Sequence, residues 1–205
     1  LLAMRNAANR EHVPALDTRK KELESHLRTR FSDADRAAIR AMDTIQTYNA
    51  YYRKFKKTYH VQLQSVALKG RPIPHVSALV EAMFMAELKN LLLTAGHDLE
   101  VGRQPVTLDV SKGGERYTML NGREQELKPD DMTISDAEGI ISSVIYGPNQ
   151  RTRITHDTRQ VLFTVYAPPG IGMKSVRHHL EDIQANVTLA APQAQVELSE
   201  VYGTD

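Results

Sequence analysis

Two places in this sequence put a histidine directly before an aspartate. They are His97-Asp98, which follows a long apolar segment, and His156-Asp157, which lies in a polar loop. An imidazole can act as a general base, and a carboxylate beside it can orient the ring. Neighbouring side chains also point apart in an extended chain, so adjacency alone does not establish either pair. We take His97 and Asp98 as the catalytic candidates.

The loop from Gly147 to Asp157, GPNQRTRITHD, is the segment most typical of a binding site. It is long, polar and cationic, and it lies between two apolar stretches. An arginine fork can pair with a carboxylate group through two hydrogen bonds. The binding candidates in and around this loop are Tyr146, Gly147, Arg151, Arg153 and Thr158.

A second cluster mixes aromatic and cationic side chains in TYNAYYRKFKKTYH, residues 47–60. Cations bind phosphates and aromatic rings stack on unpaired bases, which favours contact with nucleic acid. The same residues could serve a helix C-terminus, where cations favour the dipole and tyrosines pack half-buried. The candidates for nucleic-acid binding are Tyr51, Arg53, Lys54, Lys56 and Lys57, with Arg71 further along the chain.

Charge is distributed unevenly although the formal net charge is only +1. No Asp or Glu lies between Thr44 and Val80, whereas acidic residues outnumber basic ones between Leu99 and Gly139. If these two regions fold onto different faces, the molecule has a basic side and an acidic side.

Several familiar sites are not found in the sequence. There is no GxSxG or HExxH pattern, and GIGMKS at residues 170–175 lacks the glycine that precedes the lysine of a phosphate-binding loop. His178 and His179 are adjacent on an expected helix and point about 100° apart, so they cannot share an ion. With 0 cysteines, thiolate sites and disulfides are excluded. We expect neither a metal nor another cofactor.

Length and composition indicate one core. A chain of 205 residues can bury roughly 70% of the surface of its unfolded state. No apolar run approaches the ~18 residues of a membrane span, and the N-terminal LLAM is too short for a signal peptide core. The absence of cysteine fits a reducing compartment, so we expect a cytoplasmic protein without membrane contact.

The expected helices lie mainly in the first half of the chain. Residues 1–30 predict a solvated helical extension, and residues 31–205 the main domain. Ser32 is the expected cap of a helix that runs to about Lys56. The segment from Leu68 to Asp98 predicts a stiff proline-containing start, a long core helix to about Leu92, and a left-handed cap at Gly96.

After Asp98 the apolar period changes to two, which is typical of strands. The expected strands cover residues 106–110, 117–120, 123–127, 132–135, 140–146 and 160–166, with Asn121-Gly122 as a hairpin turn. A helix over about 173–189 and a last strand at 195–201 follow. Such close spacing leaves no room for crossover helices, so we predict an α+β fold with a largely antiparallel sheet packed on the long helix.

In this order of elements the sequence resembles the B3/B4 domain of the bacterial phenylalanyl-tRNA synthetase beta subunit, and still more the stand-alone proteins built around that domain. The similar segments are YNAYYRKFKKTYHVQLQSVALKGRPIPHVSALVEAM, LTAGHDLEVGRQPVTLDVSKGGERYTMLNG, LKPDDMTISDAEGIISSVIYG and RTRITHDTRQVLFTVYAP. The similarity covers approximately residues 39–202, and residues 1–30 lie outside it.

The resemblance implies an α+β module that contacts tRNA and holds an editing pocket, where a wrong amino acid is hydrolysed from its tRNA. Asp98 fits the acid after the central helix, and Gly147 and Thr158 fit the residues that bracket the long loop. The family pattern has a histidine where this chain has Ala95, and His97 is adjacent to the acid instead. The resemblance therefore does not imply editing of tyrosine wrongly attached to phenylalanine tRNA, which is the substrate of the family's pocket.

Three hypotheses follow. The first is a tRNA-binding protein, or a trans-acting aminoacyl-tRNA deacylase, in which cations such as Lys54 and Arg153 hold the RNA. The second is a binding module for an amino acid or another small carboxylate, held by Arg151 or Arg153 without chemistry. The third is a protein-interaction domain whose basic patch meets an acidic partner.

Overall fold

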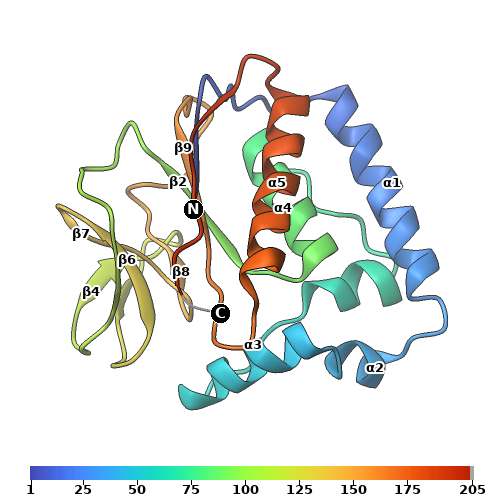
Figure 1. The fold of residues 1–205 in the computed structure, drawn as a ribbon, viewed down its shortest axis with the longest axis horizontal. Helices are drawn as coiled ribbons and strands as arrows, with labels where there is room; N and C mark the ends of the chain where they lie inside the picture. Colours follow the sequence, from blue (N-terminus) through green and yellow to red (C-terminus); the bar gives the residue numbers. More distant parts are fainter. Residues whose placement is uncertain (204–205) are drawn as a thin grey trace.

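A computed structural model describes residues 1–203, which form an α+β fold of two four-stranded antiparallel sheets, a two-stranded hairpin and a helical layer (Figure 1). The helices are α1 Pro14–Arg30, α2 Arg36–Arg40, α3 Asp43–Lys54, the π-helical turn η1 Gln64–Leu68, α4 Ala78–Asn90 and α5 Met173–Ala190. The strands are β1 Leu2–Arg5, β2 Thr94–Asp98, β3 Thr107–Val110, β4 Arg116–Thr118, β5 Glu124–Glu126, β6 Met132–Asp136, β7 Gly139–Ser143, β8 Gly147–Pro148, β9 Val161–Val165 and β10 Gln195–Ser199.

The first sheet has the strand order β10-β1-β9-β2, and each neighbouring pair is antiparallel. One of its two inner strands, β1, comes from the N-terminal residues, for which the sequence predicted only a helix. Leu2 and Met4 are fully buried there, and α1 begins later, at Pro14. The expectation of a solvated helix from residue 1 is therefore wrong for the first residues, because they fill a gap between two distant strands.

The second sheet has the order β3-β6-β7-β8, with the β4-β5 hairpin beside it. The hairpin turns at Asn121-Gly122, as predicted, and the positive φ of Gly122, 79°, suits that turn. A small core joins this sheet to the first one: it contains Ala95 of β2, Ile134 of β6 and Ile141 of β7. Predicted strands between residues 106 and 166 are confirmed, although β2 and the short β8 were not predicted.

The helices cover the face of the first sheet that is turned away from the second sheet, and α4 and α5 pack together there (Figure 1). The large core lies between these layers and includes Phe163 of β9, Leu79 of α4 and Ile183 of α5. Two buried polar contacts attach α1 to α4 and to the segment before it. Lys20 donates to Glu81 at 2.7 Å, and the N–H of Ile73 donates to Glu24 at 2.7 Å.

The central helix α4 is shorter than predicted. It ends at Asn90, and Leu91 takes the left-handed conformation of the cap with φ 61°. Gly96 is instead a residue of β2, so its prediction as the cap is wrong. A Cβ at Gly96 would lie 2.6 Å from Cδ1 of Ile154. Glycine is needed here because the side chain of Ile154, from the long loop, packs directly against the backbone of β2.

The helix predicted from Ser32 to Lys56 is two helices. Asp35, not Ser32, caps α2 by accepting the N–H of Ala38 at 2.8 Å. The chain then bends near Met42 before α3 begins at Asp43. Helix α5 spans Met173–Ala190 and confirms the last predicted helix.

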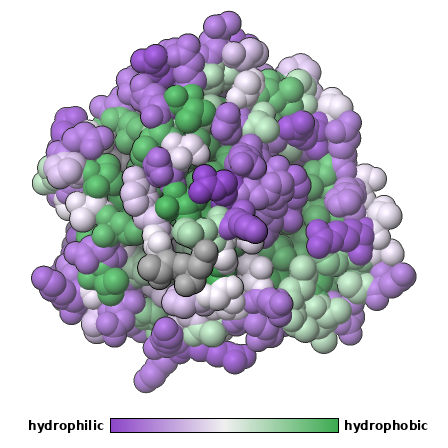
Figure 2. Space-filling view, viewed as in Figure 1, coloured by the Kyte–Doolittle hydropathy of each residue, from purple (hydrophilic) through white to green (hydrophobic). Residues whose placement is uncertain are grey.

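Within residues 1–203, no helix is long and apolar enough to cross a membrane. Hydrophilic side chains lie around the outline of the view in Figure 2, with hydrophobic ones among them.

Candidate functional site

His97 of β2 lies in a polar layer between the two sheets, and its side chain is 1% exposed. It pairs across the ladder with Leu162, and Ala95 on the same face of β2 packs against the second sheet. Burial is the main cause that lowers the pKa of His97 to about 4; Asp136 opposes this shift and Arg151 adds to it. The imidazole is therefore neutral near pH 7.

Two residues of the long loop hold the imidazole. Nδ1 of His97 lies 2.8 Å from Oγ1 of Thr152, and that hydroxyl donates to Oδ1 of Asn149 at 2.7 Å. A hydroxyl carries one proton, so Nδ1 is the donor to Thr152 and Nε2 carries a lone pair. Nε2 is buried without a hydrogen-bond partner among the described residues. The arrangement leaves an oriented, neutral base.

Asp98 faces the other side of the strand. Its Oδ2 accepts the hydroxyl of Thr158, and its Oδ1 accepts the N–H of Glu100 at 2.9 Å. One carboxylate oxygen thus fixes the loop to the end of β2, and the other holds the turn that follows β2. Alternation along the strand separates His97 from Asp98, so Thr152 and not Asp98 orients the ring. A catalytic role for either residue stays a prediction.

Arg151 is engaged by acids of the second sheet. Its Nη2 donates to both carboxylate oxygens of Asp136 at 2.6 Å, and its Nε lies 3.2 Å from Glu138. Burial raises the pKa of Asp136, but hydrogen bonds from Arg151 and two backbone N–H groups outweigh it and hold the pKa below its usual value. Arg153 is exposed and forms no ion pair within the described chain.

The other binding candidates are not brought into one pocket. Thr158 is buried beneath Asp98. The carbonyl of Gly147 accepts the hydroxyl of Tyr117 at 2.7 Å, and the ring of Tyr146 lies 5.3 Å from Nζ of Lys57. Tyr146 therefore lies beside the end of α3, Gly147 lies in β8 of the second sheet, and Thr158 lies at the end of β2.

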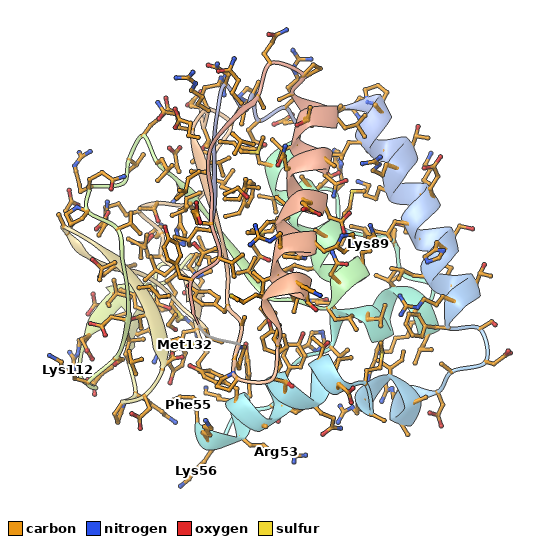
Figure 3. The ribbon with its side chains drawn as sticks, in the orientation of Figure 1. Arg53, Phe55, Lys56, Lys89, Lys112 and Met132 are labelled. Carbon is orange, nitrogen blue, oxygen red and sulfur yellow. The ribbon has the colours of Figure 1, made fainter. Side chains whose placement is uncertain are left out.

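The end of α3 carries the predicted cations, and the name basic end is used below for Arg53, Lys54, Lys56 and Lys57. All are exposed, and none forms an ion pair with a described acid. Arg53 and Lys56 project from the free end of the helix in Figure 3. Arg71 lies elsewhere, since its neighbour Gly70 is bound by Arg28 of α1 at 3.2 Å.

Tyr51 differs from its cationic neighbours because its ring is buried, with 5% exposure. Its hydroxyl donates to Asp131 at 2.9 Å and accepts the N–H of Met132 at 2.7 Å. Burial raises the pKa of Tyr51, and hydrogen bonding to Asp131 adds to the shift. The ring fastens α3 to the second sheet and is not available for stacking.

The basic end contacts the segment that follows the β4-β5 hairpin. Nζ of Lys128, which follows β5, donates to the carbonyl of Phe55 at 2.9 Å. The basic end therefore lies next to the segment between Leu99 and Gly139, in which acidic residues predominate.

Sequence reasoning missed Asn149 and Thr152, which orient His97, and Thr164, whose buried Oγ1 has no partner in the described part of the chain. Thr152 is separated from His97 by 55 residues, and neither asparagine nor threonine has a distinctive pattern there. Thr164 pairs with Ala95 across the ladder and shares the face of His97.

Comparison with known proteins gives one family and several relatives. A family model described as the B3/4 domain matches residues 46–186. The chain is 32% identical over 101 residues to the phenylalanine–tRNA ligase beta subunit of Anaeromyxobacter dehalogenans (strain 2CP-C), covering 44% of this chain and 12% of that protein. It is 34% identical over 68 residues to the same subunit of Tropheryma whipplei (strain Twist), covering 32% of this chain and 7% of that protein.

A solved structure has a similar fold. It is an N-terminal fragment of the phenylalanyl-tRNA synthetase beta subunit from Pyrococcus horikoshii, with a TM-score of 0.50 and 16% identity. The match covers 58% of this chain and 41% of that one. The chain thus spans 12% and 7% of the length of the two named beta subunits and less than half of the solved fragment.

Proposed function

The chain belongs to the B3/4 domain family, and on that premise we propose that it binds tRNA through the basic end of α3. The observation that carries the proposal is the set of exposed cations there, none of which is neutralised by a described acid. Unpaired lysine and arginine side chains release counterions when they contact phosphates, which favours binding. The related beta subunits are, by name, parts of a ligase that acts on tRNA.

Neighbouring groups support this surface. Nζ of Lys57 lies above the ring of Tyr146, and Nζ of Lys54 lies 5.9 Å from the ring of Tyr51. Tyr146 is half-buried, so part of its ring remains open beside the cations. An RNA strand that contacts the basic end can therefore meet an aromatic surface as well as charge.

Binding is tested by fluorescence anisotropy with labelled tRNA at several salt concentrations. We expect the Lys54→Glu/Lys57→Glu variant to bind more weakly and to reduce the slope of log K against log salt by about 1 for each phosphate that is no longer bound. A matched control is Arg10→Glu/Lys21→Glu, which makes the same charge change at exposed residues near or within α1. Equal weakening in both variants contradicts a local surface.

Hydrolysis of an aminoacyl ester is the second candidate function, favoured by the free lone pair on Nε2 of His97. A neutral imidazole can activate a water molecule, and Thr152 holds this one in a fixed tautomer. The base acts only where an ester can reach Nε2 between the sheets, since the side chain is 1% exposed.

The test follows release of the amino acid from correctly and wrongly charged tRNAs. Release above the protein-free rate that is lost in His97→Gln and reduced in Thr152→Val supports a deacylase. Binding without release identifies a non-catalytic tRNA-binding domain. If tRNA does not bind and free amino acids raise the melting temperature, the small-carboxylate module is favoured. Arg153 then becomes the first residue to test, because Arg151 is already paired.

A further inference from the structure

A cavity of about 80 Å³ lies between the C-terminal turn of α4 and the segment that follows α3. One ordered water needs only about 10–15 Å³, so the space accepts a larger molecule. The cavity is separate from the basic end and from His97. Its lining residues are mostly apolar, and those used below are Tyr59, Val66, Phe84, Glu87, Leu91 and Leu92.

Glu87 supplies a carboxyl group to this apolar wall. Its Oε1 accepts the N–H of Thr94 at 2.6 Å. Oε2 forms no hydrogen bond with another described residue, and no lysine, arginine or histidine of the described chain lines the cavity. A carboxylate in such surroundings lacks a counter-charge, which a ligand can provide.

None of the titratable groups around Glu87 in the described chain supplies a positive charge to its carboxylate. They are Tyr48 and Tyr52 of α3 and Tyr59 after it, with His179 of α5 reaching only as far as Oγ1 of Thr94 at 2.7 Å. Burial raises the pKa of Glu87 to about 8, and the hydrogen bond from Thr94 opposes part of that shift. Unless a cation is bound beside it, the carboxyl group is therefore protonated near pH 7.

Aromatic rings and aliphatic side chains complete the wall. Tyr59 and Phe84 present rings, which attract cations through their π faces. Leu91 and Leu92 present aliphatic surface to the same space. An anionic ligand finds no cation among these lining residues, whereas an ammonium group finds a carboxylate and two rings.

We propose that this cavity binds a small amine with a short apolar group, with the ammonium at Oε2 of Glu87 and the apolar group among the leucines. The proposal goes beyond tRNA binding and does not rest on it. The ammonium replaces the proton of Glu87, so binding is coupled to release of that proton. The structure thus assigns a ligand class of primary or secondary alkylamines and arylalkylamines.

The test uses isobutylamine, with isobutanol and isobutyrate as probes of similar shape and different charge. Binding is followed by calorimetry and by NMR shifts of the amides of Leu91–Leu93. We expect the amine to bind and isobutyrate not to bind. Because the amine competes with a proton, its affinity should rise about 50- to 100-fold from pH 6 to pH 8.5 and then level off.

Two variants locate the site. Glu87→Gln keeps an acceptor for Thr94 and should lose the preference for amine over alcohol, whereas Glu11→Gln at an exposed acid should not. Val66→Phe should block both ligands by filling the cavity, with circular dichroism to verify folding. The proposal is overturned if wild type does not bind the amine at millimolar concentration, if the alcohol binds as tightly, or if Glu87→Gln retains the pH-dependent affinity.

Discussion

Replacing Glu87 with Gln should stabilise the protein, by an amount that depends on pH. The pKa of Glu87 is raised to about 8, above the value near 4.3 of an unfolded chain. A group with a raised folded pKa stabilises the native state in its protonated form, fully below the unfolded pKa. That contribution is lost as the pH rises through the folded pKa. Glutamine resembles the protonated side chain at every pH.

The magnitude follows from the size of the shift. Between about pH 4.5 and 8, the free energy of unfolding of wild type should fall relative to the variant by about 1.4 kcal/mol per pH unit. The difference is therefore near zero at pH 4.5 and about 5 kcal/mol in favour of Glu87→Gln at pH 8.5. Tyr59 and Thr94 stay in place in both proteins, because the amide keeps the shape of the acid.

Urea unfolding followed by circular dichroism from pH 4.5 to 9 measures this difference. His97 and His179, whose pKa values are lowered to about 4 by burial, lose their contribution as the pH falls below about 6.5. They act equally in both proteins and cancel in the subtraction. A difference between the two proteins that does not change with pH would refute the reasoning.

Two further predictions concern buried contacts. Lys20→Met should lower the free energy of unfolding by about 3 kcal/mol, because it leaves the carboxylate of Glu81 without its buried cation. Adding Glu81→Gln should restore part of that loss. Thermal and urea unfolding of the single and double variants test this, and losses that simply add in the double variant contradict it. Gly96→Ala should cost about 1–3 kcal/mol, since the new Cβ lies 2.6 Å from Cδ1 of Ile154. Ile154→Val in the same chain should relieve that clash, and an unchanged loss of stability argues against it.

The candidate site was predictable where its residues are contiguous. The basic end follows from a run of cations without nearby acids, and the Asn121-Gly122 hairpin was predicted correctly, whereas the single helix expected up to Lys56 is two helices. Tyr51 shows the limit of such patterns. It belongs to the same run of aromatic and cationic residues as the basic end, yet its ring faces inward and its hydroxyl donates to Asp131. Which side of a helix is buried depends on the sheet that packs against it.

Asp98 and Arg151, both expected in one pocket, bind different partners in the structure. Arg151 binds Asp136 of the second sheet, and Asp98 binds Thr158 and the backbone. Each contact joins segments that are separated in sequence, and no local pattern distinguishes a carboxylate that fixes a loop from one that meets a ligand. The orienting role of Thr152 for His97 arises in the same way.

Local sequence patterns are enough to establish the α+β class, most strands between residues 106 and 166, helix α5 and the basic end, because periodicity, turn residues and charge are properties of short segments. The packed structure was needed to show that Leu2–Arg5 is an inner strand, that α4 ends before Leu91 and that Gly96 belongs to β2. Strand β1 exists through its pairing with β9 and β10, and Gly96 is required by the approach of Ile154. Such features depend on partners that fold next to them, so the free energy that fixes them is not contained in any short segment.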